Sequence, residues 1–275
     1  MDKRYIQLYS LGECMQKDFI GSLRRVKEIG YTGVEFAGGF YGGLSAAELK
    51  ATLAEIGLDP ISSHISLELI PGHLDYAVEL GVRYLIVPVA IFSTYDEALA
   101  LARELDKVGK LCAERGIKLG YHNHHHEFYS GKDGTLMETL FKHTDPANVC
   151  FQLDVGWASC TGIDCPAFLK QQPNRVALIH VKECAEVVPP DKLPDFSQFE
   201  KDADGNLIIS QEFLIEFSKG NKWNGPTGQG IVDWPAVRDA ALSQGIEAFI
   251  TEREYNYSDD IFECIQADCD YLKSL

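Results

Sequence analysis

The sequence lacks features that define several large classes of proteins. Its longest apolar runs, such as RYLIVPVAIF at 83–92, are shorter than the roughly 20 residues of a membrane-spanning helix. The N-terminal residues MDKRYIQLYS contain no apolar stretch of the kind found in signal peptides, so we expect a cytoplasmic protein. The eight cysteines include no CxxC pair, which argues against a zinc knuckle and favours reduced, mostly buried thiols.

Positive charge is also scarce in this chain. The 275 residues contain 25 Lys and Arg against 41 Asp and Glu, which gives a formal net charge of −16. Nucleic acid and anionic membrane surfaces repel such a chain, and no basic stripe offsets the repulsion, so we expect neither as a partner. A small polar molecule or a cation is compatible with this charge.

Eight apolar segments with strand-like composition alternate with amphipathic segments. The predicted strands are 4–9, 32–36, 60–65, 83–88, 117–122, 148–154, 175–181 and 247–252. The clearest helix is 95–114, where apolar residues recur at helical spacing. This alternation predicts an α/β fold, a single (β/α)8 TIM barrel over residues 1–275. A doubly wound open sheet is the alternative, but no GxGxxG loop follows the first strand.

One segment interrupts the alternation. Residues 185–227 are far longer than an ordinary connection after a strand, and they are rich in Pro, Asp and Gly. Within them, DADGNLII at 202–209 is typical of a hairpin turn. Because the segment follows the seventh strand, it belongs to the face of the barrel where active sites lie. We predict an inserted lid or subunit contact; a surface excursion is the alternative.

Polar residues stand at the ends of the predicted strands. The carboxyl ends of barrel strands converge on one mouth, so such residues are the first candidates for chemistry. In chain order they are Glu35, His64, His122 with Asn123 and His124, Asp154, His180 with Lys182, and Glu252. A single residue of this kind is usually a capping carboxylate or a hydrogen-bonded core histidine. Six such strand ends in one chain predict a functional site.

Asp154, His180 and Glu252 form the most informative subset of these residues. A carboxylate, an imidazole and a second carboxylate suit one divalent metal ion of the Mn, Mg, Co or Zn type, and they leave coordination positions open. A sugar that binds through two neighbouring oxygens could reach such an ion. The ion would then polarise a carbonyl and acidify the adjacent C–H bond.

Several stretches resemble the xylose isomerase-like TIM-barrel superfamily, which contains sugar phosphate isomerases and epimerases, inosose dehydratases and endonuclease IV-type enzymes. The resemblance covers nearly the whole chain except 185–227. It is carried by YTGVEF (31–36), SSHIS (62–66), GYHNHHHEF (120–128), FQLDVGW (151–157), ALIHVKE (177–183), GQGIVDWPAV (228–237) and ITERE (250–254).

The resemblance implies a divalent metal held by residues of strands five to eight. In the family these are Glu, Asp, His and Glu, and Asp154, His180 and Glu252 match the last three. The strand-five position falls on His122, which resembles the inosose dehydratase-like branch, so His122 is the expected fourth ligand. The alternative is that Glu127 reaches back to the metal.

The histidine at position 122 bears on the expected mechanism. In the family's two-base epimerases, the Glu ligands of strands five and eight exchange a proton across the substrate, which a metal-bound imidazole cannot do. We therefore expect proton abstraction from one side, followed by isomerisation or loss of water. Glu252 is the expected base, and Lys182 or His124 the donor to oxygen. Glu35 or Glu127 would act as a second base if epimerisation occurs.

The remaining expectations concern binding. We expect His64 and Asn123 to contact substrate, and Trp157 either to stack on a sugar ring or to pack under the lid. Lys182 has an alternative role in a charge network with Glu183 or Glu252. Because Lys182 and Arg253 are the basic residues near strand ends, an unphosphorylated sugar or cyclitol is the expected substrate.

Two other functions and one assembly state stay open. An endonuclease IV-like DNA-repair enzyme shares the superfamily, but the net charge of −16 disfavours it. A non-catalytic sugar-binding protein on the same fold is the second alternative. Barrels of this type often dimerise, so a homodimer is possible.

Overall fold

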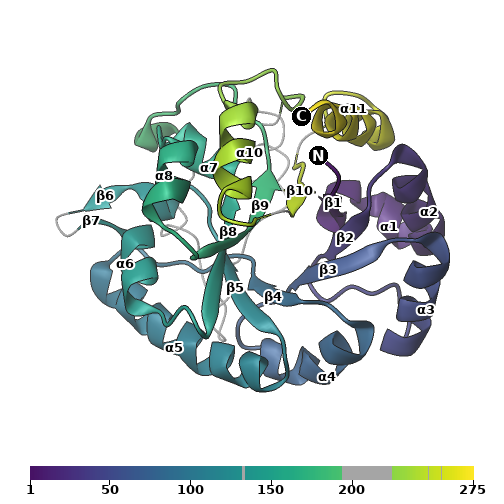
Figure 1. Cartoon of the computed structure of the whole chain (residues 1–275), viewed down its shortest axis with the longest axis horizontal. Coiled ribbons are helices and arrows are strands. Elements are labelled where there is room, and N and C mark those ends of the chain that lie inside the picture. Colours follow the sequence, from purple (N-terminus) through teal and green to yellow (C-terminus); the bar gives the residue numbers. More distant parts are fainter. Residues whose placement is uncertain (132–133, 194–224, 247, 255) are drawn as a thin grey trace.

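Eight parallel strands close into a barrel in the computed structural model, which describes residues 1–131, 134–193, 225–246, 248–254 and 256–275 (Figure 1). Around the barrel their order is β1-β10-β9-β8-β5-β4-β3-β2. The barrel strands are β1 (Arg4–Gln7), β2 (Gly33–Phe36), β3 (Asp59–His64), β4 (Tyr84–Val87), β5 (Lys118–His122), β8 (Val149–Asp154), β9 (Val176–Val181) and β10 (Phe249–Thr251). The predicted TIM barrel is confirmed.

Helices form the outer ring and cover the apolar outer face of the strands (Figure 1). Three of them begin with a reciprocal capping box, at Ser45, Thr94 and Thr135. The helices between and after the strands are α1 (Glu13–Lys17), α2 (Phe19–Ile29), α3 (Ala46–Ile56), α4 (Ile70–Leu80), α5 (Tyr95–Glu114), α6 (Leu136–His143), α7 (Val155–Cys160), α8 (Cys165–Gln171), α10 (Trp234–Leu242) and α11 (Ile261–Ser274). The predicted helix at 95–114 is α5.

The interior of the barrel changes from apolar to polar along its axis. Tyr5, Leu178 and Ile250 belong to a small buried apolar cluster between the strands. Side chains two positions apart on a strand point to the same face, so the next inward residues are Gln7, His180 and Glu252. The register sets Asp154 beside His180 and His122 beside Gln152 on neighbouring strands. Polar groups therefore meet at the carboxyl ends of the strands.

The first strand is shorter than predicted. The sequence predicts a strand over 4–9, but β1 ends at Gln7 and a short 3-10 helix, η1 (Leu8–Leu11), follows it. The side chain of Gln7 accepts a hydrogen bond from the backbone N–H of Tyr9 at 3.1 Å, which turns the chain out of the sheet. This turn places the Tyr9 ring at the mouth of the barrel, where it is 54% exposed.

Most of the predicted insertion lies outside the described residues. The expected hairpin turn at 202–209 falls within 194–224, outside the described residues. The described parts of the insertion include a short 3-10 helix, η3 (Pro190–Lys192). A further small element, not predicted, is a 3-10 turn, η2 (His126–Phe128), followed by a two-stranded ribbon of β6 (Ser130–Gly131) and β7 (Gly134–Thr135).

Two expectations about composition can be compared with the structure. All eight cysteines lie in the described residues as free thiols, and seven of them are buried, as expected. None of the helices in the described ranges combines the length and apolar composition that crossing a membrane requires.

Asp233 caps helix α10, as its position before Trp234 and Pro235 predicts. Its side chain accepts a hydrogen bond from the backbone N–H of Ala236 at 3.0 Å. We expect Asp233→Ala to lower the free energy of unfolding by about 1 kcal/mol, because an N-terminal N–H loses its acceptor. Denaturant unfolding measures the change. Asp239→Ala, an exposed site on the same helix, is the control and should change stability less.

Candidate metal centre

The carboxylate of Glu35 is the deepest polar group in the mouth of the barrel. It is fully buried and accepts from side chains of four other strands at 2.5 to 3.0 Å, namely Gln7, Ser62, His64, Gln152 and His180. Burial alone would raise its pKa, but His64 and His180 hold the pKa of Glu35 well below its usual range. Glu35 is therefore an ionised anchor whose oxygens are occupied by donors.

Gln152 joins this anchor to the layer above it. Its amide N–H donates to Glu35, and its carbonyl oxygen lies 2.8 Å from Nε2 of His64 and 2.9 Å from Nδ1 of His122. An acceptor at Nδ1 of His122 fixes the proton on that nitrogen and directs the Nε2 lone pair toward Asp154. Gln152 was not predicted as a site residue. Its spacing of two residues from Asp154 is the signal that could have identified it.

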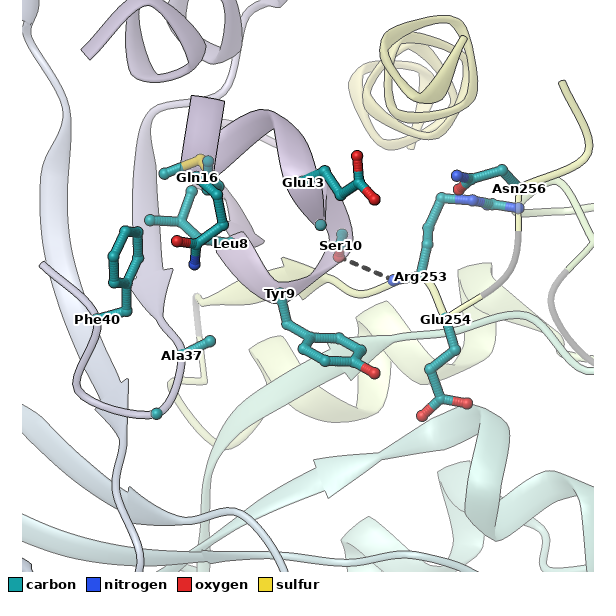
Figure 2. A pocket seen from close by; sticks show the side chains of 13 residues that line it. Leu8, Tyr9, Ser10, Glu13, Gln16, Ala37, Phe40, Arg253, Glu254 and Asn256 are labelled. Atoms are coloured by element: carbon teal, nitrogen blue, oxygen red, sulfur yellow. Dashed lines mark hydrogen bonds between the residues drawn. The ribbon is translucent and has the colours of Figure 1, made fainter. Parts of the chain in front are cut away.

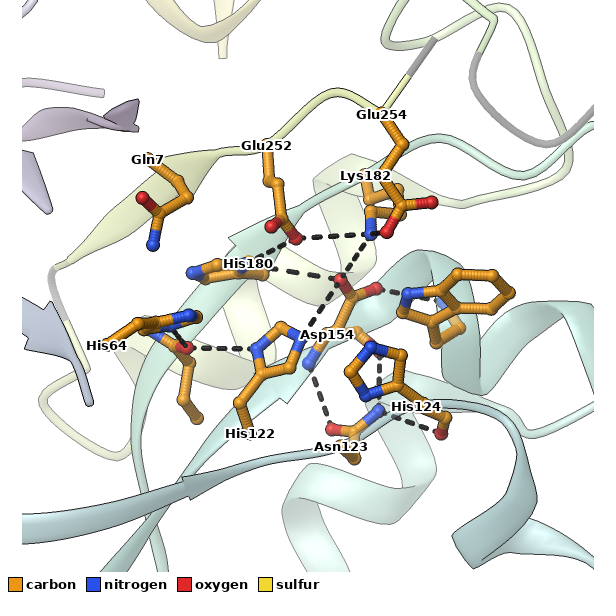
Figure 3. A network of polar contacts seen from close by, with 12 residues as sticks. Gln7, His64, His122, Asn123, His124, Asp154, His180, Lys182, Glu252 and Glu254 are labelled. Carbon is orange, nitrogen blue, oxygen red and sulfur yellow. Dashed lines mark hydrogen bonds and ion pairs between the residues drawn. The ribbon is translucent and has the colours of Figure 1, made fainter. Parts of the chain in front are cut away.

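Four potential metal ligands meet above Gln152, in the middle of Figure 3. One ligand atom from each of His122, Asp154, His180 and Glu252 lies within 4.8 Å of the others. Nε2 of His122 is 3.8 Å from Oδ2 of Asp154, and Nδ1 of His180 is 3.1 Å from Oε2 of Glu252. All four residues are buried. This buried set of imidazoles and carboxylates could hold a divalent metal ion.

The two oxygens of Asp154 have different surroundings. Oδ1 accepts from the backbone N–H of Trp157 at 2.8 Å and so caps α7. Oδ2 is buried and accepts no hydrogen bond from the described part of the chain. It faces His122 and His180, at 3.8 and 4.0 Å from their nearest nitrogens, and forms a longer ion pair with Nζ of Lys182 at 3.4 Å. The contact with Lys182 is longer than a hydrogen bond, so this buried oxygen is only partly satisfied. A divalent ion could satisfy it at closer range, and the donor set fits such a metal.

Lys182 lies beside the four potential ligands and is almost completely buried. Its ammonium group is 2.9 Å from Glu254, 3.1 Å from Glu252 and 3.4 Å from Asp154. The charge network expected for Lys182 is therefore present with Glu252. Its other expected partner, Glu183, instead accepts from the backbone of residues 228 and 184 and from Trp234. Glu254 was not predicted; it stands two residues after Glu252 in ITERE, which places both near the mouth.

The charges of this cluster are strongly interdependent. Burial disfavours the charged form of His180, but Glu35 and Glu252 outweigh it and raise the pKa of His180 to about 10. Burial and the neighbouring His180 hold the pKa of His122 well below its usual range, so this ring is neutral. Burial likewise opposes charge on Lys182, but three carboxylates raise its pKa well above the ordinary value. His180 and Lys182 are thus the internal cations of the cluster.

Glu127 and Asn123 are turned away from the cluster. Glu127 accepts from Tyr121 Oη at 2.7 Å and from the backbone N–H of His124 at 2.9 Å, and burial raises its pKa to about 7. It is His122, not Glu127, that lies with Asp154, His180 and Glu252. Asn123 uses both ends of its amide on the backbone of Asp154, at 3.0 and 3.2 Å. Asn123 thereby positions Asp154.

Trp157 and the other histidines of the 122–126 run form one wall of the mouth. Trp157 is buried, and Nζ of Lys182 lies 4.9 Å from the centre of its ring. The rings of His124 and His125 pack on the indole, with centres 5.6 and 5.3 Å away. His126 Nε2 lies 3.0 Å from the carbonyl oxygen of Ala90. Trp157 also belongs to a buried cluster with Val188 and Leu193 of the inserted segment, and its stacking on a sugar ring stays a prediction.

The chain belongs to the family described as the xylose isomerase-like TIM barrel, whose model matches residues 23–275. It is similar to the inosose dehydratase of Clostridium perfringens, with 30% identity over 173 residues that cover 58% of this chain and 54% of the relative. The chain thus spans about half the length of that relative.

Two further comparisons agree with this assignment. Inosose dehydratase 2 of Bacillus cereus is 26% identical over 209 residues, which cover 66% of this chain and 67% of the relative. A solved sugar phosphate isomerase/epimerase from Parabacteroides distasonis superposes with a TM-score of 0.74 at 23% identity, covering 100% of this chain and 94% of that structure. At this level of identity the structural likeness shows the fold alone.

The raised pKa of His180 predicts that manganese binding releases a proton. At neutral pH the ring is protonated without metal, because its pKa is about 10, whereas a metal ligand must be neutral. Apparent affinity should therefore rise with pH up to about that value. Calorimetric titration with Mn²⁺ at pH 7.5, in two buffers of different ionisation enthalpy, should give about one proton released per ion. The variant Lys182→Met should still release this proton, because the proton comes from His180. Equal binding enthalpies of Mn²⁺ in the two buffers would contradict the prediction.

The position of Gln152 predicts a second effect on metal binding. Gln152→Leu removes the acceptor that fixes the His122 proton and should weaken Mn²⁺ binding by roughly 10- to 100-fold, as expected for a partner behind a ligand. Gln171→Leu on α8, an exposed site, is the matched control. Binding is measured by titration at a temperature where circular dichroism shows both variants folded. Unchanged affinity in Gln152→Leu would show that the His122 ring needs no such partner.

Proposed function

We propose that this chain is a divalent-metal-dependent enzyme that abstracts a proton next to the carbonyl of an unphosphorylated keto-sugar or cyclitol. The observation that carries the proposal is the convergence of His122, Asp154, His180 and Glu252, within 4.8 Å of one another, at the mouth of a barrel. Relatives with the name inosose dehydratase support the class of reaction.

Different side chains have different roles in such a reaction. A divalent ion held by these four residues supplies a Lewis acid that polarises the substrate carbonyl. Lys182, held positive by its carboxylate neighbours, stabilises the negative charge that develops on the substrate oxygen. Glu252 accepts the proton from carbon. Lys182 and His180 hold the pKa of Glu252 well below its usual range despite burial, and loss of the His180 proton removes one of these constraints.

The distribution of carboxylates favours chemistry from one side of the substrate. Glu252 and Glu254 both belong to the end of β10, and Lys182 contacts both of them. On the β5 side, His122 takes the place of a carboxylate, and Glu127 is bonded to Tyr121 and the backbone of His124. Isomerisation or loss of water after a single proton abstraction suits this arrangement better than exchange between two opposed bases.

The buried residues also limit the roles of Glu35 and His124. The five donors around Glu35 suit it to orienting His180 and His64, with no lone pair spare for a substrate proton. Burial holds the pKa of His124 well below its usual range, so its ring carries no extra proton to donate. We therefore assign the donor role to Lys182 in preference to His124.

Hydrogen exchange with solvent tests the proposal. Keto-sugars and inososes are incubated with the protein and Mn²⁺ in D₂O, and nuclear magnetic resonance follows deuterium entry at the carbon next to the carbonyl. We expect exchange that chelation abolishes and Mn²⁺ restores. Asp154→Asn should lower the exchange rate by at least about 100-fold through loss of metal. Asp259→Asn, an exposed carboxylate outside the cluster, is the matched control and should keep the rate.

The same samples distinguish the proposal from a non-catalytic sugar-binding protein. Such a protein would show no exchange with any compound of the panel while still binding one of them in Mn²⁺. Protein that contains no divalent ion after purification and gains none from Mn²⁺ would contradict the metal centre itself.

A further inference from the structure

A cavity of about 550 Å³ adjoins the cluster at the mouth of the barrel (Figure 2). Its walls come from three connections that follow strands: η1 with α1 after β1, the glycine-rich turn after β2, and the residues after β10. This volume is in the range of small-molecule sites. Because all three walls follow the carboxyl ends of strands, the cavity opens on the same face as His122, Asp154, His180 and Glu252.

Glu254 is the boundary between the cluster and this cavity. It lines the cavity, and its Oε1 is 2.9 Å from Nζ of Lys182. Its Oε2 is buried and has no hydrogen-bond partner within the described residues. An acceptor left in this state costs free energy unless a ligand donates to it. A hydroxyl group of a bound molecule is the simplest donor at this position.

The far side of the cavity carries two aromatic rings that solvent reaches. Tyr9 is 54% exposed and Phe40 is 37% exposed. In the view of Figure 2, Tyr9 lies between Phe40 and Glu254, and its hydroxyl points toward Glu254. Phe40 is held by an edge-to-face contact with Phe19, with ring centres 5.6 Å apart. Large aromatic side chains that stay accessible beside a polar site mark a binding surface.

Polar side chains complete the lining of the cavity and indicate which kind of ligand it suits. Gln16 and Asn256 also line the cavity and can both donate and accept hydrogen bonds. Accessible aromatic faces with amide groups around them suit a ring that has an apolar face and polar edges. The carboxylates Glu13 and Glu254 in the same lining disfavour an anionic ligand, and the cation of the lining, Arg253, is paired with Asp268 at 2.7 Å.

We propose that this cavity binds a second ring, joined by a glycosidic bond to the sugar that reacts at the cluster. The substrate is then a glycoside whose reacting sugar carries the carbonyl, with the second ring against Tyr9 and Phe40 and a hydroxyl near the linkage donating to Glu254. The inference rests on the proposed function, which places the reacting sugar over the four potential ligands. The second ring is either a sugar or an aromatic aglycone, since both offer a flat apolar face.

Binding of unreactive glycosides in the presence of Mn²⁺ tests this inference. Methyl β-D-glucoside, phenyl β-D-glucoside and methyl β-cellobioside are titrated calorimetrically into the whole chain, and the corresponding β-D-xylosides are treated in the same way. We expect a ring-bearing ligand to bind about tenfold more tightly than its methyl counterpart, because it buries additional apolar area. Tighter binding of the phenyl glycoside than of the disaccharide would identify the second ring as an aromatic aglycone. Tighter binding of the disaccharide would identify it as a sugar.

Three variants locate the preference in the cavity. Tyr9→Ala and Phe40→Ala should each bring the affinities for the ring-bearing and methyl ligands toward the same value. Glu254→Gln should weaken binding of the ring-bearing ligand. Leu111→Ala, which removes an exposed apolar side chain outside the cavity, is the control and should keep the tenfold preference. Circular dichroism and the Mn²⁺ stoichiometry establish that each variant is folded.

The outcomes separate this inference from the proposed function. Equal affinity for methyl and ring-bearing ligands, binding of none of them, or a preference that survives both aromatic substitutions would overturn the second-ring site. Deuterium exchange in free keto-sugars together with any of these results leaves the proposed function standing. A ring preference without exchange in any keto-sugar or inosose supports the site and contradicts the proposed chemistry.

Discussion

The geometry of the candidate centre depends on one buried carboxylate. Glu35 receives hydrogen bonds or close contacts from side chains of β1, β3, β8 and β9, which makes it the common neighbour of five strands including its own. Its negative charge raises the pKa of His180, and through Gln152 its influence reaches the tautomer of His122. A buried charge is tolerated only when it is fully satisfied. The need to satisfy Glu35 therefore orders two of the four potential metal ligands.

The layer above Glu35 is controlled by cations belonging to the protein itself. Asp154, Glu252 and Glu254 would repel one another at these distances without Lys182, which contacts all three. His180 supplies the second positive charge between Glu35 and Glu252. A bound divalent ion would take over the contact to Asp154 and Glu252 and release Lys182 for a substrate oxygen. The same lysine thus has one role that stabilises the apo barrel and another that suits catalysis.

The barrel and three of the four potential ligands could be predicted because they depend on local pattern. Runs of apolar residues ending in Asp154, His180 or Glu252 define both the strand and the face on which its last side chain lies. Gln7, Ser62, Gln152 and Glu254 were missed for a physical reason. For Gln7, Ser62 and Gln152, an uncharged polar residue in a strand has the same sequence signature whether it faces the barrel interior or a helix, and only the register decides. Glu254 lies beyond the last residue of β10, where the strand pattern no longer fixes the direction of a side chain. Tyr9 was assigned to a strand because nothing local signals the hydrogen bond from its own N–H to Gln7.

The histidine at position 122 connects the electrostatics with the type of reaction. A glutamate there would add a negative charge to a cluster that already holds Asp154, Glu252, Glu254 and Glu35 within reach of two internal cations. A neutral imidazole coordinates a metal without that charge, and its Nδ1 is engaged by Gln152. The carboxylates of Glu252 and Glu254 lie after β10, both paired with Lys182, and Glu254 lines the cavity. In the proposed reaction, substrate and base would therefore lie on the same side, which is the arrangement that a one-sided proton abstraction requires and that a two-base inversion does not.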